Sequence, residues 1–448
     1  MSMSIACGGI RRTSLVAALA LCGAAALPVG DVHAATRVVT NCNNSGAGSL
    51  RAVASTAASG DTLDLSGLSC TRITLASEIL LPQTNLRLLG RDRLAMTLHG
   101  NRVTRVLHHT GTGTLTVERL SVSYGFVHGA TAFGGCIEST GNVTLRQSRA
   151  HHCLADADSG DQAIARGGAI HADGAVLLDR SSVFESHAMA LVESLGGGVS
   201  SLGKTTMLQS QVYDNSADWG GGVAPEDGFR MTYSLLQDNL ANEFGGGANV
   251  TGNAEINKST VSGNHSNEAA GGLQFNAGPA NTEAVIAEST ISGNSADDRV
   301  SAIAFVSAEG RIFNSTIVDN HEATTDECWG AVFTFGMSME STVVTGNTCD
   351  AGFTRDIGDL PAQNAQVTGS HNLVGSASVS LPPDTIFSAT HGLGPLASNG
   401  GPTRTHAVLA GSPLIDRGNN LLLRSFDQRG TPFARVRGAA PDIGAFER

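Results

Sequence analysis

The sequence predicts an all-β fold: a right-handed single-stranded parallel β-helix with an N-terminal cap and a small C-terminal domain. Three observations support it: a motif that returns every 24–30 residues, apolar residues that alternate with polar ones, and abundant glycine. Glycine supplies 55 of 448 residues, whereas aromatic residues make up 4% and charged residues 15%. A period of this length is the signature of a solenoid, in which each repeat packs only against its neighbours.

Each repeat combines a glycine motif with a later motif that ends in asparagine. The first occurs as GGGV at 196–199 and 220–223, GGGA at 245–248 and AGGL at 270–273. The second ends in Asn215, Asn239, Asn264, Asn294 and Asn320. Period-two alternation between the motifs indicates strands, so three short strands per repeat would form one coil. We expect the asparagines to stack as an amide ladder and, like the glycines, to adopt positive φ at the corners.

The first 34 residues have the plan of a signal peptide. Arg11 and Arg12 precede an apolar run over 15–27, and the small residues before Ala35 predict cleavage after Ala34. The alternative, an uncleaved membrane anchor, is weakened by the shortness of this run. We therefore expect an extracytoplasmic protein that is secreted, periplasmic or on the cell surface, with no membrane-spanning segment in the mature chain.

The mature chain divides into three predicted parts. Residues 35–90 would hold the N-terminal cap and first coils, because 48–53 read as a short helix and an open first coil needs a cover. Residues 91–390 would form the β-helix, and residues 391–448 the C-terminal domain.

Six cysteines remain after signal-peptide removal. They allow fifteen pairings, so the connectivity stays open, but they cluster in the sequence as three pairs. The pairs are Cys42 with Cys70, Cys136 with Cys153, and Cys328 with Cys349, each separated by about one coil. Neighbouring coils lie ~4.8 Å apart, which suits a disulfide. Metal binding by these cysteines is the weaker interpretation, because no CxxC spacing occurs.

The charge argues against a nucleic-acid partner. The net charge is −12, and Lys204 and Lys258 are the only lysines, whereas phosphate binding needs clustered cations.

Two stretches resemble known families. The repeated glycine motifs resemble those of polymorphic outer-membrane proteins. The C-terminal motifs NGGPT, GSPLID, DQRG and DIGAFE, all within 394–447, resemble the choice-of-anchor Q domain of bacterial β-helix surface proteins. GAGSLRAV with GDTLDLS is similar to the N-terminal cap of such proteins. The resemblance implies a secreted or surface-exposed protein of unassigned biochemistry.

Catalytic candidates are few. Asp297, Asp298 and Arg299 form the most enzyme-like cluster, since paired carboxylates can cleave glycosides, but adjacent strand residues face opposite ways. Lys258 could be the base of a polysaccharide lyase. It shares an outward position with Gln209, Glu288, Asn314 and Glu340, which favours a solvated surface residue instead.

Binding candidates come from two further rows. Asp218, Glu243 and Glu268 recur once per coil and could hold Ca²⁺ between them. Trp219 and Phe244 directly follow two of these residues and could line a sugar-binding ladder, although inward packing at the corner is the alternative.

Together these features favour a non-catalytic surface-interaction or adhesion protein without a required cofactor, with a polysaccharide or a host or cell surface as its partner. The alternative is a lyase or glycoside hydrolase that acts on an acidic polysaccharide.

Overall fold

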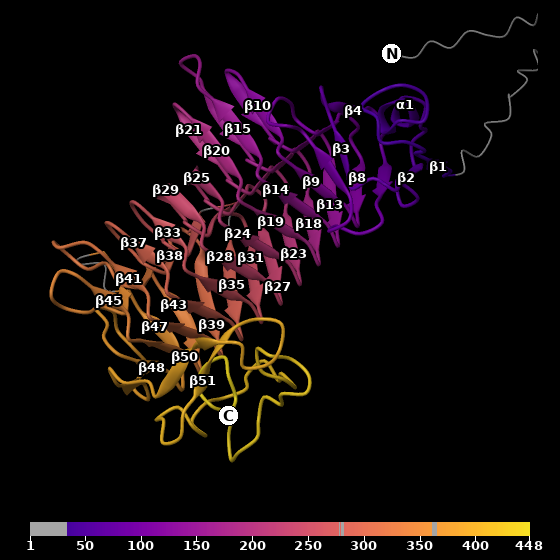
Figure 1. The fold of residues 1–448 in the computed structure, drawn as a ribbon. Helices are drawn as coiled ribbons and strands as arrows, with labels where there is room; N and C mark the ends of the chain where they lie inside the picture. The colour runs from indigo at the N-terminus through magenta and orange to yellow at the C-terminus, as the bar shows by residue number, and fades with distance from the viewer. Residues whose placement is uncertain (1–33, 277, 279–281, 361–364) are drawn as a thin grey trace, which may run out of the picture. The chain divides into compact units, whose positions relative to one another are not determined.

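The computed structural model describes residues 34–276, 278, 282–360 and 365–448, so the predicted signal peptide lies almost wholly outside the described residues. From Ala34 onward the chain forms one compact unit. It is a right-handed parallel β-helix whose strands stack coil upon coil (Figure 1). The first coils carry three short strands, as expected, whereas later coils carry four or five because sheet D adds one or two strands to each.

Sheet A is one of two 13-stranded sheets, and every pairing in it is parallel. Its strands are β1 (Thr36–Val38), β2 (Thr62–Asp64), β5 (Leu86–Leu89), β8 (Thr114–Glu118), β13 (Asn142–Arg146), β18 (Val176–Asp179), β23 (Thr205–Leu208), β27 (Phe229–Thr232), β31 (Ala254–Asn257), β35 (Glu283–Ala287), β39 (Glu309–Phe313), β43 (Met337–Glu340) and β47 (Val367–Ser370). Alternate side chains of these strands fill the interior of the solenoid.

Sheet B follows sheet A across two corner residues in most coils, the first of which has positive φ. Its strands are β3 (Arg72–Thr74), β6 (Thr97–His99), β9 (Ser121–Ser123), β14 (Arg149–His151), β19 (Ser182–Phe184), β24 (Gln211–Tyr213), β28 (Leu235–Gln237), β32 (Thr260–Ser262), β36 (Thr290–Ser292), β40 (Thr316–Val318), β44 (Val343–Thr345), β48 (Leu373–Val374) and β49 (Ile386–Phe387).

Sheet C has 11 strands and comes after the glycine motif in each coil. Its strands are β4 (Ile79–Leu81), β7 (Leu107–His109), β12 (Ile137–Ser139), β17 (Ile170–Ala172), β22 (Val199–Ser201), β26 (Val223–Pro225), β30 (Ala248–Thr251), β34 (Leu273–Asn276), β38 (Ile303–Phe305), β42 (Val332–Thr334) and β46 (Ile357–Gly358).

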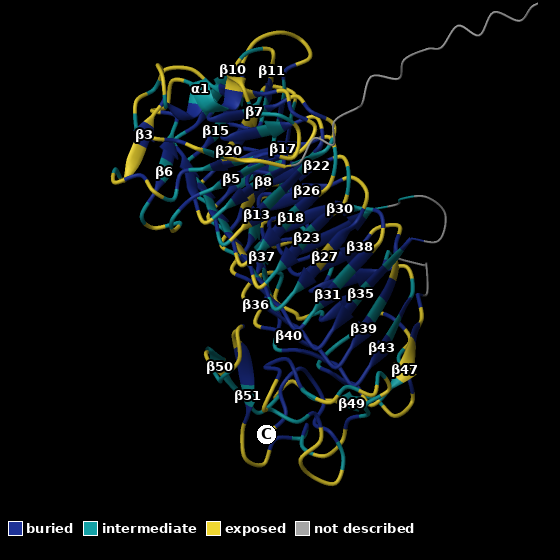
Figure 2. Ribbon diagram, turned by 90° about the vertical axis from the view of Figure 1, so that its right-hand side faces the viewer, coloured by how far each residue is buried: buried dark blue, intermediate teal, exposed yellow. Residues whose placement is uncertain are grey.

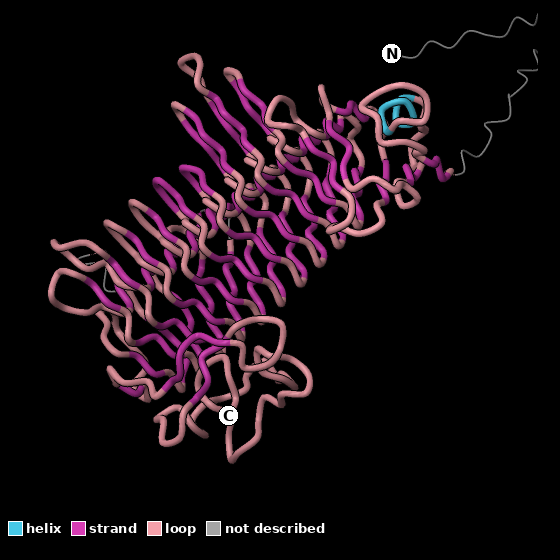
Figure 3. The backbone as a smooth tube through the Cα atoms, viewed as in Figure 1, coloured by secondary structure: helices cyan, strands magenta, loops and turns pink. Residues whose placement is uncertain are grey.

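Sheet D runs out along one side of the coils as projecting fins (Figure 3). Its main path is β10 (Phe126–His128), β15 (Leu154–Ala157), β20 (His187–Ala190), β25 (Ser216–Trp219), β29 (Leu240–Phe244), β33 (His265–Ser266), β37 (Ser295–Ala296), β41 (His321–Glu322) and β45 (Thr348–Cys349). A second arm, made of β11 (Thr131–Phe133), β16 (Ile164–Arg166) and β21 (Glu193–Leu195), returns toward sheet C. A cluster of buried alanines, including Ala132, Ala155 and Ala165, packs in these fins.

Two ladders of polar side chains run through the solenoid. Asn215, Asn239, Asn264, Asn294 and Asn320 donate from Nδ2 to Oδ1 of the asparagine one coil further on, at 2.8–3.0 Å. Asn347 continues the row and donates to buried Asp356. In parallel, backbone N–H groups of the serine row, such as Ser210 and Ser234, donate to the next coil's serine Oγ. The predicted amide ladder is confirmed.

At the corners marked by the asparagines, positive φ lies on a different residue than predicted. The asparagines keep negative φ, and the residue before each takes the left-handed conformation, as Asp214 and Asp238 do. The first residue of each of the four glycine motifs has positive φ: a glycine in three of them, such as Gly220 at 64°, and Ala270 at 59° in the fourth. A Cβ on Gly220 would meet the carbonyl oxygen of Val223 at 2.5 Å, which accounts for glycine at this corner.

The N-terminal cap consists of helix α1 (Leu50–Ser55) and its flanking loops. The side chain of Ser49 caps the helix by accepting from the backbone N–H of Ala52, and Leu50 and Ala54 are buried. The disulfide between Cys42 and Cys70 ties the loops together. The other two predicted disulfides, Cys136–Cys153 and Cys328–Cys349, are also present.

The C-terminal segment, residues 391–448, folds back over the outer face of sheet B. It contributes an antiparallel pair, β50 (Leu393–Ala397) and β51 (Thr405–Val408), and its loops hydrogen-bond to side chains of β32, β36 and β40. The covered strands β32, β36, β40 and β44 have both faces buried, whereas β14, β19, β24 and β28 keep a partly exposed outer face (Figure 2). The segment thus covers only the second half of sheet B.

The asparagine ladder yields a stability prediction. Asn264→Ala should lower the free energy of unfolding by about 3 kcal/mol, because the N–H groups of Asn239 lose their buried acceptor. Chemical denaturation measures the change. Asn267→Ala, an exposed asparagine of the same coil, is the control and should cost less than about 0.5 kcal/mol. Equal effects of the two variants would contradict a structural role for the ladder.

Candidate functional site

Two registered rows of side chains run along the solenoid, one on sheet C and one on the fins, and we call the strip between them the groove. Its floor is the outward-facing row of sheet C, in which His108, Glu138, His171 and Ser200 are paired in register. Their neighbours along each strand, such as Ile137 and Ile170, point into the core, because side chains alternate across a strand. We call this the floor row, and it continues through Ala224, Asn249, Gln274, Ala304 and Phe333.

The opposite side of the groove is a second registered row, on the fins. It consists of Phe133, Arg166, Leu195, Trp219, Phe244, Ala269 and Arg299, each paired with the next. We call it the wall row. Its side chains meet the floor row directly: the rings of Phe133 and His171 lie 4.9 Å apart. The groove therefore presents one wall and one floor residue per coil.

The N-terminal end of the groove holds a charge network. One nitrogen of the Arg105 guanidinium lies 2.6 Å from Glu78, and the other lies 2.7 Å from Glu138. His108 lies between the same two carboxylates, with Nδ1 3.0 Å from Glu78. The hydrogen bond to His108 and the charge of Arg105 lower the pKa of Glu78. Both carboxylates are thus already paired, and the lowered pKa keeps Glu78 ionised.

His171 lies one coil beyond this network, at the bottom of the groove. It is only 3% exposed, and burial lowers its pKa to about 4, so its imidazole is neutral at pH 7. Nε2 lies 3.4 Å from Asp173, and among the described residues no group hydrogen-bonds to Nδ1. A neutral imidazole with one free nitrogen thus lies near the cations Arg105 and Arg166.

The groove opens into a cavity of about 360 Å³ around Trp219. Arg166 and Glu226 form an ion pair at its edge, with a nitrogen–oxygen distance of 2.5 Å. Asn249 and Asn276 also line it and hydrogen-bond to each other. The lining combines one large aromatic ring with charged and amide groups, a combination typical of ligand pockets.

The C-terminal end of the groove is built around Trp329. The guanidinium of Arg299 lies 5.5 Å from the centre of its indole ring, and Phe333 lies 5.7 Å from it. Buried Glu322 accepts the backbone N–H groups of Trp329 and Gly330. Burial raises the pKa of Glu322 to about 7. Its two hydrogen bonds to backbone N–H groups hold this segment in place, so Glu322 is not an ordinary surface acid.

The structure separates the residues of the predicted catalytic cluster. Asp298 forms an ion pair with Arg299 at 2.9 Å, whereas Asp297 lies 3.6 Å from His265. Both aspartates are exposed. Of the three residues, only Arg299 belongs to the groove.

The predicted calcium ligands are engaged in other contacts. Asp218 accepts hydrogen bonds from Ser194 and Asn242, and Glu243 accepts from the indole N–H of Trp219. With Glu268 they do not form one cluster in the part of the chain that is described. The group that does bring three ligand atoms within 4.8 Å is His128, Asp156 and Asp158, on the fins. Calcium at Asp218, Glu243 and Glu268 stays a prediction.

Trp219 and Phe244 are neighbours in the wall row. Their rings meet edge to face, with centres 5.3 Å apart, so they do not form one flat platform. Of the two, Trp219 lines the cavity.

The interpretation of Lys258 as a solvated surface residue is wrong. Its side chain points outward from the coil, but the C-terminal segment covers it, leaving the residue 9% exposed. Its ammonium lies 2.6 Å from fully buried Glu288 and donates to the carbonyl oxygens of Phe426 and Asp427. Burial lowers the pKa of Lys258 and raises the pKa of Glu288. Lys258 therefore fastens the C-terminal segment.

The floor row was not predicted from the sequence. His109, next to His108 in the strand, points inward, where it hydrogen-bonds to Ser139 and to the backbone of Gln83. The only sequence signal for this row is the alternation of apolar and polar residues, which places His108, Glu138 and His171 on the outer face. Alternation cannot show which residues of neighbouring coils lie side by side when the coils differ in length.

Comparisons with known proteins give no family assignment. No family model matches the chain, and no curated protein matches it. Among solved structures, the crystal structure of pectate lyase Pel9A is similar, with 12% sequence identity and a TM-score of 0.47. The alignment covers 93% of this chain and 98% of that chain. The family resemblances of the repeats and of the C-terminal motifs therefore stay predictions.

The class of protein follows from the fold and its cross-links. Three disulfides indicate an extracytoplasmic environment, since cytosolic thiols are kept reduced. Over the described residues, no helix is long and apolar enough to cross a membrane. The chain is a disulfide-bonded parallel β-helix protein of an extracytoplasmic compartment.

The Lys258 contact yields a prediction about the C-terminal segment. Lys258→Met should lower the free energy of unfolding by about 3–5 kcal/mol, because it leaves the Glu288 carboxylate buried without a partner. Denaturation and limited proteolysis within 391–448 measure the effect. The double variant Lys258→Met with Glu288→Leu should recover most of the loss. A single variant as stable as the wild type would contradict the fastening role.

Proposed function

We propose that this protein is a non-catalytic, extracytoplasmic glycan-binding protein that holds an extended polysaccharide along the groove between the floor row and the wall row. One observation carries the proposal: both rows advance by one residue per coil over several coils. Coils stack ~4.8 Å apart, so the groove offers regularly repeated contacts to a polymer that itself repeats.

The chemistry of the lining supports a sugar ligand. Trp219 supplies a large apolar surface with a polar edge, and such rings are suited to interfaces that are partly apolar and partly wet. Asn249 and Asn276 supply amide groups that can exchange hydrogen bonds with hydroxyls. Arg105 and Arg166 form ion pairs that neutralise charge within the lining. Because Glu78 and Glu138 are already paired with Arg105, the arrangement favours binding over acid–base chemistry at these two carboxylates.

A role at the cell surface is supported by three features. The disulfides suit an oxidising compartment. The predicted signal peptide would export the chain, and the C-terminal motifs resemble those of bacterial surface proteins. We therefore infer that the protein mediates surface interaction or adhesion through its bound glycan.

Substitution in the cavity tests the proposal. Trp219→Ala should weaken polysaccharide binding about tenfold or more, because a central aromatic contact contributes at least ~1.4 kcal/mol. Affinity electrophoresis against a panel of neutral and acidic polysaccharides measures the loss. Phe387→Ala removes an exposed aromatic residue of sheet B, outside the groove, and should leave binding unchanged. Failure to bind any polysaccharide, or equal binding by both variants, would overturn the proposal.

A second candidate function, cleavage of an acidic polysaccharide, is favoured by His171. A lyase removes the proton beside a uronate carboxylate, breaks the bond to the leaving sugar oxygen, returns a proton to that oxygen, and leaves a carbon–carbon double bond. The free Nδ1 of neutral His171 could accept the first proton, and Arg105 and Arg166 could stabilise the charge that develops.

Ultraviolet absorbance of the unsaturated product tests this candidate. If the protein is a lyase, it should release that product from polyuronates, and His171→Ala should abolish the reaction. His187→Ala, an exposed histidine of the fins, should not. Absence of product with the wild-type protein, or full activity of His171→Ala, would contradict cleavage at this site.

A further inference from the structure

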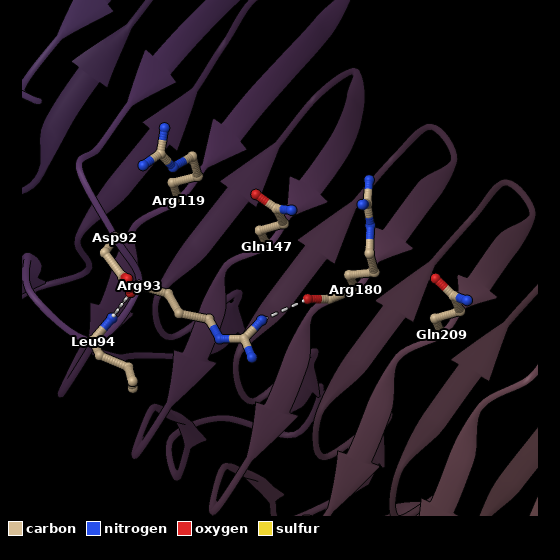
Figure 4. Close-up of a pocket in the computed structure, with 7 residues that line it drawn as sticks. All are labelled: Asp92, Arg93, Leu94, Arg119, Gln147, Arg180 and Gln209. Carbon is tan, nitrogen blue, oxygen red and sulfur yellow. Dashed lines mark hydrogen bonds between the residues drawn. The ribbon is translucent and has the colours of Figure 1, made fainter. Parts of the chain in front are cut away.

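A row of four polar side chains marks the corner between sheets A and B, away from the groove. Arg119, Gln147, Arg180 and Gln209 occupy the same position in four successive coils. Each has positive φ, at 53°, 47°, 49° and 48°, so the backbone turns sharply in the same way at each. Figure 4 shows their side chains standing side by side along the corner. We call them the corner row.

The corner row lines a hollow of about 500 Å³, and a loop from an earlier coil forms its other side. From this loop, Arg93 reaches across and donates to the carbonyl oxygen of Arg180 at 2.9 Å (Figure 4). Arg119 in turn donates to the carbonyl oxygen of Arg91. Arg93 and Arg119 are thus placed by contacts with backbone carbonyls, whereas Arg180 donates to the Asp179 carboxylate from Nε at 3.1 Å and from Nη2 at 3.4 Å.

The charge of the hollow is opposite to that of the chain as a whole. Three arginines and one aspartate, Asp92, line it, whereas the chain carries a net charge of −12. Asp92 already accepts the backbone N–H of Leu94.

Two neighbouring acids on sheet A are paired. Asp179 lies 3.1 Å from Arg180, and Glu118 lies 3.0 Å from Arg87. Arg93 and Arg119 have no acidic partner among the described residues, so the hollow keeps an excess of positive charge.

The corner row also has defined ends. The next position toward the C-terminus is Tyr233. Its hydroxyl lies against Gly430 of the C-terminal segment, 2.8 Å from where a Cβ on that glycine would stand. The C-terminal segment therefore covers the row at this point. The position after it is Lys258, which that segment buries. At the other end, the loop that carries Arg93 forms the boundary.

We propose that this hollow is a second ligand site, and that it binds an acidic polysaccharide through its carboxylate or sulfate groups. The planar guanidinium fork matches such oxyanions with two parallel hydrogen bonds, and the glutamine amides between the arginines suit sugar hydroxyls. Arg119 and Arg180 are two coils apart, about 10 Å at the stacking distance of β-strands. A pyranose residue in an extended chain advances by a length close to one coil, so acidic groups two sugars apart would reach both arginines.

Binding measurements on the full mature chain test this site. The probes are hyaluronate for carboxylate, dextran sulfate for sulfate, and unmodified dextran as the neutral polymer. We expect one or both acidic polymers to bind with an affinity that falls as salt is added, because exposed charge pairs are screened. The double variant Arg119→Gln with Arg180→Gln should weaken that binding at least tenfold. Arg180→Lys, which keeps the charge but loses the fork, should weaken it less.

Two controls separate this site from the groove. Arg417→Gln removes an exposed arginine of the C-terminal segment and should leave acidic-polymer binding unchanged. In the Trp219→Ala background, which weakens groove binding, the double arginine variant should lower the remaining acidic-polymer binding by the same factor as it does in the wild type. The proposal is overturned if the double variant, with an unchanged unfolding midpoint, binds both acidic polymers as the wild type does. It is equally overturned if dextran binds with the same arginine dependence or if neither acidic polymer binds.

Discussion

The register between successive coils is the constraint on which every other feature depends. Backbone hydrogen bonds between parallel strands set the spacing, and the buried asparagine and serine rows fix which residue lies above which. A shift of one residue would turn each strand's core side chains outward. It would also leave the Asn264 amide without its partner in a region where water cannot replace it. The floor row, the wall row and the corner row exist as continuous lines because this alignment holds.

The C-terminal segment divides the outer surface of the solenoid into two regions. It covers the second half of sheet B, where the Ser292 hydroxyl hydrogen-bonds to His406 and the Thr316 hydroxyl accepts from the backbone N–H of Ala445. Its core includes a guanidinium, that of Arg429, held between the rings of Phe433 and Phe446 and paired with Asp427. These residues lie in or near motifs that resemble a surface-protein domain, and the structure gives them a packing role. The uncovered half of the corner carries the arginines.

The sequence was sufficient for features that repeat. The glycine and asparagine motifs predicted the coils and the ladder, and the spacing of the cysteines favoured the three pairs, because each follows from what one coil requires of the next. The environment of Lys258 was not predictable, since its partner carbonyl at Phe426 lies 168 residues away and belongs to no repeat. Glu138 and His171 were missed for a related reason. They lie in coils that lack the asparagine motif, so their alignment with His108 follows from the fold alone.

The central claim, that the groove binds a polysaccharide, has a direct spectroscopic test. The chain contains two tryptophans, Trp219 and Trp329, and both lie along the groove. Titration of the folded protein with a polysaccharide that it binds should change the intensity or the emission maximum of tryptophan fluorescence, with the same dissociation constant that an independent binding method gives. Binding shown by the independent method with unchanged tryptophan emission would place the ligand elsewhere and contradict the account.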